Sequence, residues 1–389
     1  MDVFIICNED YPNICASEVK ELINKESEIF PGLCVIPKVS PKELAILSYR
    51  LQSAYRIGIL LAKENNLEDL ENNFSKIIDI NSWDLISEEV SSFAIETIKL
   101  VDHPIPSPDI SASFGSVFKK FAKNNGVSLD VNLTKPDFVG LVFIGDGFCG
   151  VGIDIIGFDL SKRPYKLFHH KNSLNGVFAY TVSRLAGVKK TDKVLDPFTA
   201  NGVLPIEIAL FQQEMSSFLF ERQFFGLRFE FSKKEFDLVE EELKLKKPQD
   251  KKIHAFDQQL KIMLGAKKNA KIAGVLDAIE CSKVDVDWLD SKFEKNDIDI
   301  IITNPPKESK RLNNLSKILK IYDELFYQAR FVLKTNGIMA LLVFKPEQII
   351  KLAEKHKLKV IDSILIHNHK QEYFLVICKN VKVEDENLN

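Results

Sequence analysis

The sequence of 389 residues lacks any apolar run near the about 18 residues that a membrane-spanning helix needs. It also lacks a marked charge imbalance. With a net charge of −3, any contact with nucleic acid has to come from local patches. The six cysteines form no C-x-x-C pair and no Cys/His ligand spacing, so we expect reduced, buried thiols in a cytoplasmic protein and no metal site. The N-terminus, MDVFIICNED, has no basic segment, which argues against a signal peptide.

Two phosphate-binding patterns are missing as well. The sequence contains neither G-x-G-x-x-G nor G-K-[ST], so a glycine-rich pyrophosphate cradle is not expected. What is present is a composition of 45% hydrophobic and 28% charged residues, which is typical of folded soluble proteins. The length predicts two or three domains.

Local patterns divide the chain into three parts. Residues 1–65 alternate strand and helix and predict a small α+β domain similar to a ferredoxin-like domain; SPKELAILSYRL, with a serine cap and an early proline, is one of its helices. Residues 66–168 predict a second α+β unit with the strands SFAIETIKLV, FVGLVFIGD and FCGVGIDII. In residues 169–389, buried strands alternate with helices, which favours a parallel, doubly wound sheet, and the chain closes in an antiparallel hairpin.

The predicted strands of the third part end in acidic or amide residues. Asp196, Asp257 and Asn304 end three strands, and Asp285 follows a fourth. In a parallel sheet, ligands bind at the carboxyl ends of the strands, at the topological switch point. Carboxylates at these positions can accept hydrogen bonds from ribose hydroxyls and from an adenine amino group, but they repel a pyrophosphate. The pattern therefore predicts a nucleoside cofactor without phosphate, and a positively charged sulfonium compound fits best.

The segment DIIITNPP ends a buried strand in Asn304-Pro305-Pro306. Two prolines fix the backbone and remove two N–H donors, so the corner is rigid and offers only acceptors. The Asn304 side-chain oxygen and the Pro305 carbonyl can accept both N–H bonds of a flat amino group. Such a corner orients a weak amine nucleophile without a general base.

The segments LDPFTANGVLPIEIA, AKKNAKIAGVLDAIE and DIIITNPP resemble class I S-adenosylmethionine-dependent RNA methyltransferases, in particular the THUMP-domain guanine-N2 methyltransferases of tRNA and rRNA. GVGIDIIGFDLSKRPYKLFHHKNSLN resembles the end of a THUMP domain, so residues 66–168 are interpreted as THUMP and 169–389 as a Rossmann-like methyltransferase domain. The resemblance implies methylation of a guanosine amino group in tRNA, with S-adenosylmethionine as cofactor. The implied cofactor-binding residues are Asp196, Phe198, Thr199, Ala200, Asn201, Gly202, Asp257, Gln258, Asp285, Val286 and Asn304, with Asn304, Pro305 and Pro306 as the catalytic corner.

Two positions depart from the family pattern. Lys307 stands where the family has an aromatic residue on which the flipped base stacks, and Phe344 is a candidate replacement. Ala200 stands where the family has glycine, so we expect a negative φ there. Alternatives therefore stay open: methylation of rRNA, transfer to adenine N6 or glutamine N5, or a non-catalytic RNA-binding protein.

Basic and aromatic residues mark the predicted RNA contacts, since such mixtures suit phosphates and unpaired bases. These are Lys162, Arg163, Tyr165, Lys166, Lys171, Lys307, Lys310 and Arg311. The aromatic segment FFGLRFEF (224–231) is predicted to be an insertion packed on a sheet. The expected partner is tRNA, and the protein is expected to be monomeric, without contact with a membrane.

Overall fold

The computed structural model describes residues 1–171, 173–219, 223–248, 252–307, 315–368 and 371–381. The chain forms two compact units. The first contains residues 1–161 and 218–246, and the second contains residues 162–217 and 247–389. The predicted boundaries at residues 65 and 168 stay a prediction, since strands from the first two predicted domains share one sheet.

The first unit is built on an eight-stranded sheet in the order β2-β3-β1-β4-β8-β7-β5-β6. The long strand β4 joins the two predicted domains because it pairs antiparallel with β1 on one side and β8 on the other. Its strands are β1 (Val3–Cys7), β2 (Glu28–Phe30), β3 (Leu33–Ile36), β4 (Ala54–Glu64), β5 (Ser92–Lys99), β6 (Asp130–Val131), β7 (Phe138–Gly145) and β8 (Phe148–Asp154).

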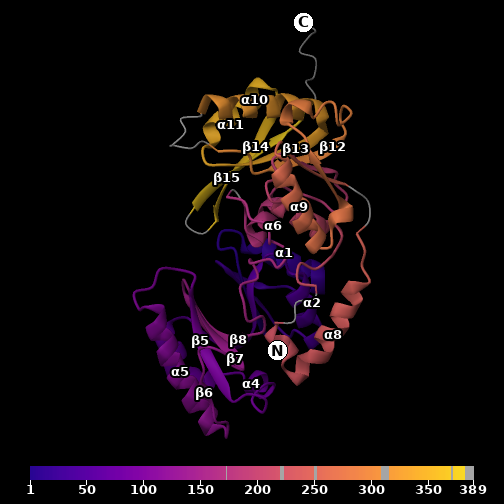
Figure 1. The fold of residues 1–389 in the computed structure, drawn as a ribbon. Coiled ribbons are helices and arrows are strands. Elements are labelled where there is room, and N and C mark those ends of the chain that lie inside the picture. The colour runs from indigo at the N-terminus through magenta and orange to yellow at the C-terminus, as the bar shows by residue number, and fades with distance from the viewer. Residues whose placement is uncertain (172, 220–222, 249–251, 308–314, 369–370, 382–389) are drawn as a thin grey trace. The chain divides into compact units, whose positions relative to one another are not determined.

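Side chains cap three helices of this unit, α2, α3 and α4. Ser40 caps α2 as predicted, accepting the Glu43 N–H while the Glu43 carboxylate accepts the Ser40 N–H, a reciprocal capping box. The helices are α1 (Pro12–Ile23), α2 (Pro41–Arg50), α3 (Leu67–Ile77), α4 (Ile80–Asp84), α5 (Ser107–Asn124) and α8 (Glu230–Lys244). Figure 1 labels α1, α2, α4, α5 and α8 of this unit, together with β5 to β8.

The aromatic insertion, predicted to pack on a sheet, lies in the hydrophobic core that the helices and the sheet of the first unit share. Phe224 lies edge-on to Tyr49 at 5.1 Å between ring centroids and 6.0 Å from Phe236 of α8. Helix α8 in turn packs against α2. The insertion therefore interrupts the second unit in sequence but buries its rings in the first.

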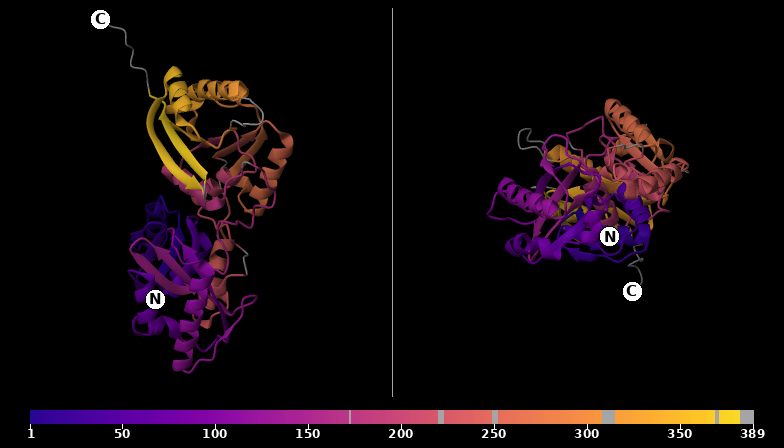
Figure 2. Two further views of the ribbon diagram at one scale, coloured as in Figure 1. Left: turned by 90° about the vertical axis from the view of Figure 1, so that its left-hand side faces the viewer. Right: turned by 90° about the horizontal axis from the view of Figure 1, so that it is seen from below.

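The second unit is a seven-stranded sheet in the order β11-β10-β9-β12-β13-β15-β14. The first five strands in this order, β11, β10, β9, β12 and β13, run parallel. Strand β15 pairs antiparallel with both β13 and β14. This confirms the predicted doubly wound, Rossmann-like sheet with a terminal hairpin, which is yellow in Figure 2. The strands are β9 (Val194–Asp196), β10 (Ile253–Asp257), β11 (Ile279–Lys283), β12 (Ile298–Thr303), β13 (Leu333–Val343), β14 (Lys359–Asn368) and β15 (Gln371–Lys379).

Helices cover both faces of this sheet. Figure 1 shows α10 and α11 on one side and α6 and α9 on the other, and the core residues of α10 and α11 cluster with Leu195, Ile301 and Leu341 of the strands. The helices are α6 (Gly176–Leu185), α7 (Val203–Gln212), α9 (Leu260–Ile272), α10 (Leu315–Val332) and α11 (Pro346–Lys355). Because both faces are buried, the central strand β12 and the second half of β13 are nearly continuous runs of apolar residues.

Candidate active site

The switch point of the second sheet lies at β9, which pairs with β10 on one side and β12 on the other. Asp196 ends β9, and its Oδ1 accepts a 2.5 Å hydrogen bond from Oγ1 of Thr303 at the end of β12. Thr303 directly precedes Asn304, so this bond joins the Asn-Pro-Pro corner to the first strand end. The expected meeting of these two segments is therefore observed.

The turn after β9 brings the backbone close to its neighbours. The Thr199 N–H donates to the Phe256 carbonyl (2.9 Å), and the Phe198 N–H donates to Asp196 Oδ1 (3.2 Å). Gly202, at φ +87°, precedes α7, and a Cβ there would lie 3.1 Å from Cβ of Ala266. Ala200 has a φ of +48°, so the expectation of a negative φ is wrong. The left-handed conformation costs a non-glycine residue about 1 kcal/mol.

Asp257 ends β10 beside this turn. Its Oδ1 accepts the Gln259 N–H at 2.9 Å, and its side chain also takes the N–H of Ala200. Burial raises the pKa of Asp257, while these N–H groups and the nearby His170 oppose the rise. Asp257 is 8% exposed, and Gln258 is exposed. The carboxylate thus lies at the strand end with part of its surface free for a ligand.

Asn269, which the sequence did not single out, holds this region together from α9. Its amide nitrogen donates to the carbonyls of Phe168 (3.0 Å) and Asn201 (2.9 Å), and its Oδ1 accepts the Phe168 N–H (3.0 Å). Asn201 also donates to the Phe168 carbonyl at 3.1 Å. The segment before α6 is therefore fixed against the turn after β9. An asparagine in the interior of a predicted helix, where this residue type is unfavourable, was the signal that could have pointed to it.

Asp285 lies two residues beyond β11, at the same edge of the sheet. The Val284 N–H donates to the Asp257 carbonyl at 3.2 Å, which keeps this segment next to the end of β10. The Asp285 side chain is exposed and that of Val286 is buried. The described contacts do not join Asp285 directly to Asp196 or Asn304, so its role stays a prediction.

The environment of Asp196 is apolar enough to change its ionisation. The side chain is 2% exposed, and burial raises its pKa to about 7, although the hydrogen bonds from Thr303 and Phe198 oppose the rise. A carboxyl group in such a site is favoured in its neutral form until a cation approaches.

The corner after β12 carries an aromatic pair and a lysine. The Lys307 ammonium donates to Asn304 Oδ1, and it lies 5.1 Å from the ring centroids of both Phe344 and Tyr373. These rings, from the ends of β13 and β15, lie 5.1 Å apart. Burial lowers the pKa of Lys307 to about 7. Its side chain is thus directed at Asn304 and the rings, where the sequence had predicted a phosphate contact.

The Asn-Pro-Pro backbone is supported from α10. The Tyr322 hydroxyl donates to the Pro306 carbonyl at 2.7 Å, and Pro305 is buried. The backbone of the corner is therefore fixed both by its two prolines and by a hydrogen bond from α10.

Two predicted RNA contacts are wrong. Nε and a terminal nitrogen of Arg163 donate to the two carboxylate oxygens of Glu207 at 2.8 and 3.0 Å, and the Tyr165 hydroxyl donates to Glu207 Oε1 at 2.6 Å. The side chains of Arg163 and Glu207 are both 0% exposed. Their charges neutralise each other inside the second unit, so neither Arg163 nor Tyr165 reaches RNA.

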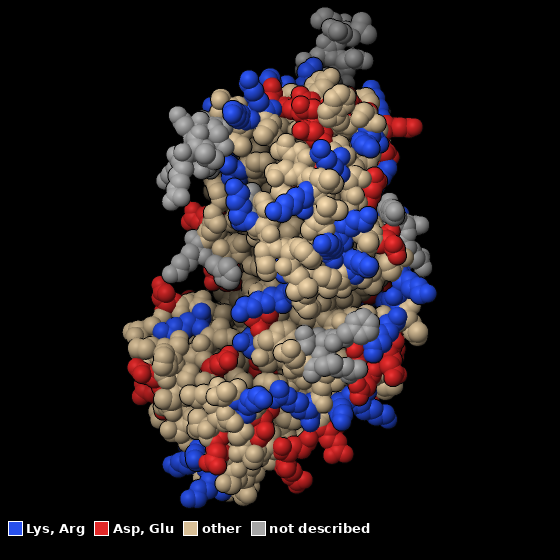
Figure 3. Space-filling view, viewed as in Figure 1, with Lys and Arg blue, Asp and Glu red and all other residues tan. Residues whose placement is uncertain are grey.

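The other predicted RNA contacts differ in their surroundings. Lys166 donates to the Leu174 carbonyl at 2.7 Å, and burial lowers its pKa. Lys162 and Lys171 are exposed, so their RNA contacts stay predictions. Lys310 and Arg311 lie outside the described residues. On the face drawn in Figure 3, lysine and arginine are interspersed with acidic residues.

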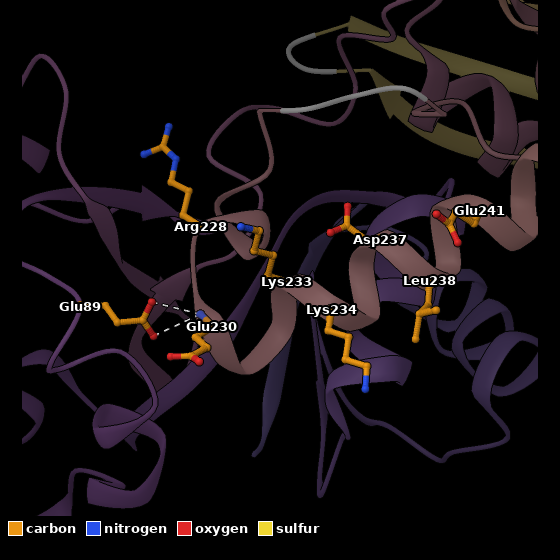
Figure 4. Close-up of a pocket in the computed structure, with 8 residues that line it drawn as sticks. All are labelled: Glu89, Arg228, Glu230, Lys233, Lys234, Asp237, Leu238 and Glu241. Carbon is orange, nitrogen blue, oxygen red and sulfur yellow. Dashed lines mark hydrogen bonds between the residues drawn. The ribbon is translucent and has the colours of Figure 1, made fainter.

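The first unit has a surface hollow of about 660 Å³ beside α8, lined by both basic and acidic side chains. There the Glu89 carboxylate accepts the Glu230 N–H at 3.0 and 3.2 Å and satisfies the first turn of α8 (Figure 4). None of the predicted site residues lines this hollow. Its lining carries charges of both signs, and the hydrogen bonds of Glu89 fix the start of α8, so we interpret the hollow as structural.

Comparison with known proteins identifies the family. The model of the RMKL-like methyltransferase domain matches residues 163–371, and that of the THUMP domain matches residues 64–154. The chain belongs to the RMKL-like methyltransferase family, in a form that carries a THUMP domain.

Individual proteins of known sequence or structure are also similar to this chain. A tRNA (guanine(6)-N2)-methyltransferase of Methanocaldococcus jannaschii is 30% identical, covering 89% of this chain and 91% of the relative. A ribosomal RNA large subunit methyltransferase K/L of Buchnera aphidicola is 26% identical over 72% of this chain but only 41% of the relative. A crystal structure described as a possible methylase from Clostridium difficile 630 shares the fold, with a TM-score of 0.79, 21% identity and 99% coverage of both chains.

Among the helices that the structure describes, none is long and apolar enough to cross a membrane.

Proposed function

We propose that this protein transfers a methyl group from S-adenosylmethionine to the exocyclic N2 amino group of a guanosine in tRNA. The observation that carries the proposal is the Thr303–Asp196 hydrogen bond, which joins the Asn-Pro-Pro corner to the strand end of the candidate cofactor site. The full-length similarity to a relative named as a tRNA guanine-N2 methyltransferase supports the choice of substrate.

The residues at the strand ends fit this cofactor. Asp196 is a buried carboxylate whose raised pKa a neighbouring ammonium or sulfonium group would lower again. Asp257, at the end of the next strand, suits the ribose hydroxyls, and Asp285 suits the adenine amino group. When bound, S-adenosylmethionine supplies a methyl group on a positively charged sulfur, which an amino nitrogen can attack.

The role of the corner is orientation. The N2 nitrogen of guanine is conjugated with its ring and is a poor nucleophile. Asn304 Oδ1 and the Pro305 carbonyl would accept its two N–H bonds and direct its lone pair out of the ring plane. The prolines and the Tyr322 hydroxyl hold these acceptors in place. No base is needed before transfer, since the proton can leave afterwards.

Lys307 has two roles in this proposal. It already donates to Asn304 Oδ1, but an amide oxygen has two lone pairs and can also accept from the target amine. Lys307 therefore fixes the Asn304 amide with its oxygen facing the target, and its amine can take up the proton that leaves. Phe344, 38% exposed at the end of β13, provides the surface on which the target base stacks, in place of the aromatic residue that position 307 lacks.

The exposed Lys162 and Lys171 and the THUMP domain would hold the tRNA. We further propose a reducing, cytoplasmic location, because all six cysteines are free.

The proposal is tested with Asn304→Ala. Wild-type protein, incubated with bulk tRNA and labelled S-adenosylmethionine, is expected to yield N2-methylguanosine by nucleoside mass spectrometry. Asn304→Ala is expected to lower kcat at least about 100-fold through lost orientation, with calorimetric cofactor affinity nearly unchanged. Asn65→Ala, at an exposed residue of the first unit, is the control and is expected to keep full activity.

Three outcomes would overturn parts of the proposal. Unchanged turnover of Asn304→Ala would remove Asn304 from the mechanism. N6-methyladenosine as the product, or product in rRNA alone, would replace the substrate. No cofactor binding at millimolar concentration would favour a non-catalytic RNA-binding protein.

A further inference from the structure

Three cysteines far apart in sequence converge in the first unit. Cys7 is the last residue of β1, Cys15 lies in α1, and Cys34 lies in β3. Their sulfur atoms all lie within 4.8 Å of one another. All three side chains are buried, at 4%, 1% and 0% exposure, and none forms a disulfide. No sequence motif points to this group, because the spacing of the three cysteines matches no familiar ligand pattern.

The fold holds the three positions firmly. Strands β1 and β3 are paired, with Ile5 opposite Cys34, and the Cys7 N–H donates to the Gly32 carbonyl at 2.9 Å. Cys34 Sγ donates to the carbonyl of Pro12, the first residue of α1, at 3.5 Å. The sulfurs therefore meet where two strands and a helix are already fixed, and a ligand would not have to order a loop to bind there.

The distances allow one ion to be bound by all three sulfurs. Three sulfurs about 4.0 Å apart surround a point about 2.3 Å from each, which is the Zn–S bond length. The observed limit of 4.8 Å allows this arrangement. Soft sulfur ligands select ions such as Zn²⁺ and Cu⁺ over Mg²⁺ or Ca²⁺, which prefer oxygen.

The neighbouring Glu18 does not extend the ligand set. Its Oε1 accepts the Gln52 N–H at 2.9 Å, and its Oε2 accepts the N–H and hydroxyl of Ser53 at 3.0 and 2.5 Å. Within the described part of the chain, the group contains cysteines only. The site thus offers three sulfurs in a dry environment.

We propose that Cys7, Cys15 and Cys34 form a binding site for a single soft, thiolate-preferring d¹⁰ cation, Zn²⁺ or Cu⁺, which ties β1, α1 and β3 together. On binding, the thiols give up their protons to solvent and the sulfurs bind the ion, with no change of oxidation state. The site is structural and lies in the unit that does not contain the candidate active site. The proposal is therefore independent of the methyltransferase function.

The test uses full-length protein purified anaerobically with a reductant and without chelators. Its metal content is measured by mass spectrometry, and it is then titrated separately with Zn²⁺ and with Cu⁺ in the presence of a competing chelator. We expect about one equivalent of one of these ions, a thiolate-to-metal charge-transfer band with Cd²⁺ as probe, and a rise in melting temperature on adding the ion, because it binds only the folded state.

Cys34→Ser is expected to lose the bound ion, the band and the rise in melting temperature. Cys149→Ser and Cys378→Ser, which remove buried thiols elsewhere, are the matched controls and are expected to keep all three. If Cys34→Ser does not fold, Cys15→Ala takes its place. The proposal is overturned if the wild type takes up less than about 0.1 equivalent of each ion when the ion is in excess. It is also overturned if Cys34→Ser or Cys15→Ala binds the ion as the wild type does. The three thiols would then be ordinary core residues.

Discussion

Replacing Asp196 by asparagine is expected to remove a pH-dependent loss of stability from the folded protein. Asp196 is 2% exposed, and its pKa rises to about 7 in the fold because of burial, against 3.8 for the ordinary group. The folded state thus binds a proton more tightly than the unfolded chain. Its contribution to stability is fully present below pH 3.8 and is lost as pH rises through the folded pKa of about 7.

The size of the effect follows from the two pKa values. Each unit of pKa difference corresponds to about 1.4 kcal/mol. Between about pH 5 and pH 8, the free energy of unfolding of the wild type should fall by about 2–3 kcal/mol from this group alone. Asparagine stays neutral and can still accept from Thr303, so the variant lacks this term. Any fixed cost of the new amide is the same at every pH and does not affect the comparison.

The assay is urea unfolding of wild type and Asp196→Asn, without cofactor, at several pH values between about 5 and 8. The free energy of unfolding of the variant relative to wild type should grow by about 2–3 kcal/mol across this range, while its affinity for S-adenosylmethionine falls.

Asp299→Asn is a control of opposite sign. The pKa of Asp299 is lowered through its hydrogen bonds from Lys334 and the Lys193 N–H, although burial opposes this, so its contribution is present at neutral pH and is lost only in acid. A difference between wild type and Asp196→Asn that does not change with pH would refute the assignment of a raised pKa to Asp196.

Three further predictions concern Glu207, Ala200 and Lys307. Glu207→Gln should lower the free energy of unfolding by about 3–5 kcal/mol in denaturant titration, because it leaves the Arg163 charge buried without its carboxylate; a loss below about 1 kcal/mol would contradict this. Ala200→Gly should raise the free energy of unfolding by up to about 1 kcal/mol by relieving the positive φ, and a decrease would argue against that conformation. Lys307→Met should lower kcat and remove a rise in kcat centred near pH 7, measured at saturating substrates; an unchanged pH profile would exclude Lys307 as proton acceptor.

The ligand edge of the second sheet was predictable because β9, β10 and β12 are mostly buried and each ends in a polar residue. Asp196, Asp257 and Asn304 identify the carboxyl edge without knowledge of long-range contacts, since parallel strands place these ends together. The ligand edge could therefore be read from local patterns.

Other features depended on contacts that the sequence does not display. Arg163 and Tyr165 look like any basic and aromatic surface pair, and only the position of Glu207 shows that they are buried together. The sequence singled out Phe344 as a candidate to replace the missing aromatic residue, but it did not display that Tyr373 lies beside Phe344 and that Lys307 lies against both rings. The conformation of Ala200 follows from the turn that surrounds it and not from its own preference.

The insertion at residues 218–246 has a practical consequence for dissecting this protein. Residues 218–246 lie in sequence between the two stretches of the second unit, but their Phe224 and Phe236 are buried in the first unit. Division of the chain at a single position therefore does not separate the two units. A fragment starting at residue 162 would carry these rings with nothing to cover them and should aggregate, while a fragment ending at residue 161 would leave Tyr49 bare. To express the units separately, residues 218–246 would have to be removed from the second unit and joined through a linker to the C-terminal end of residues 1–161.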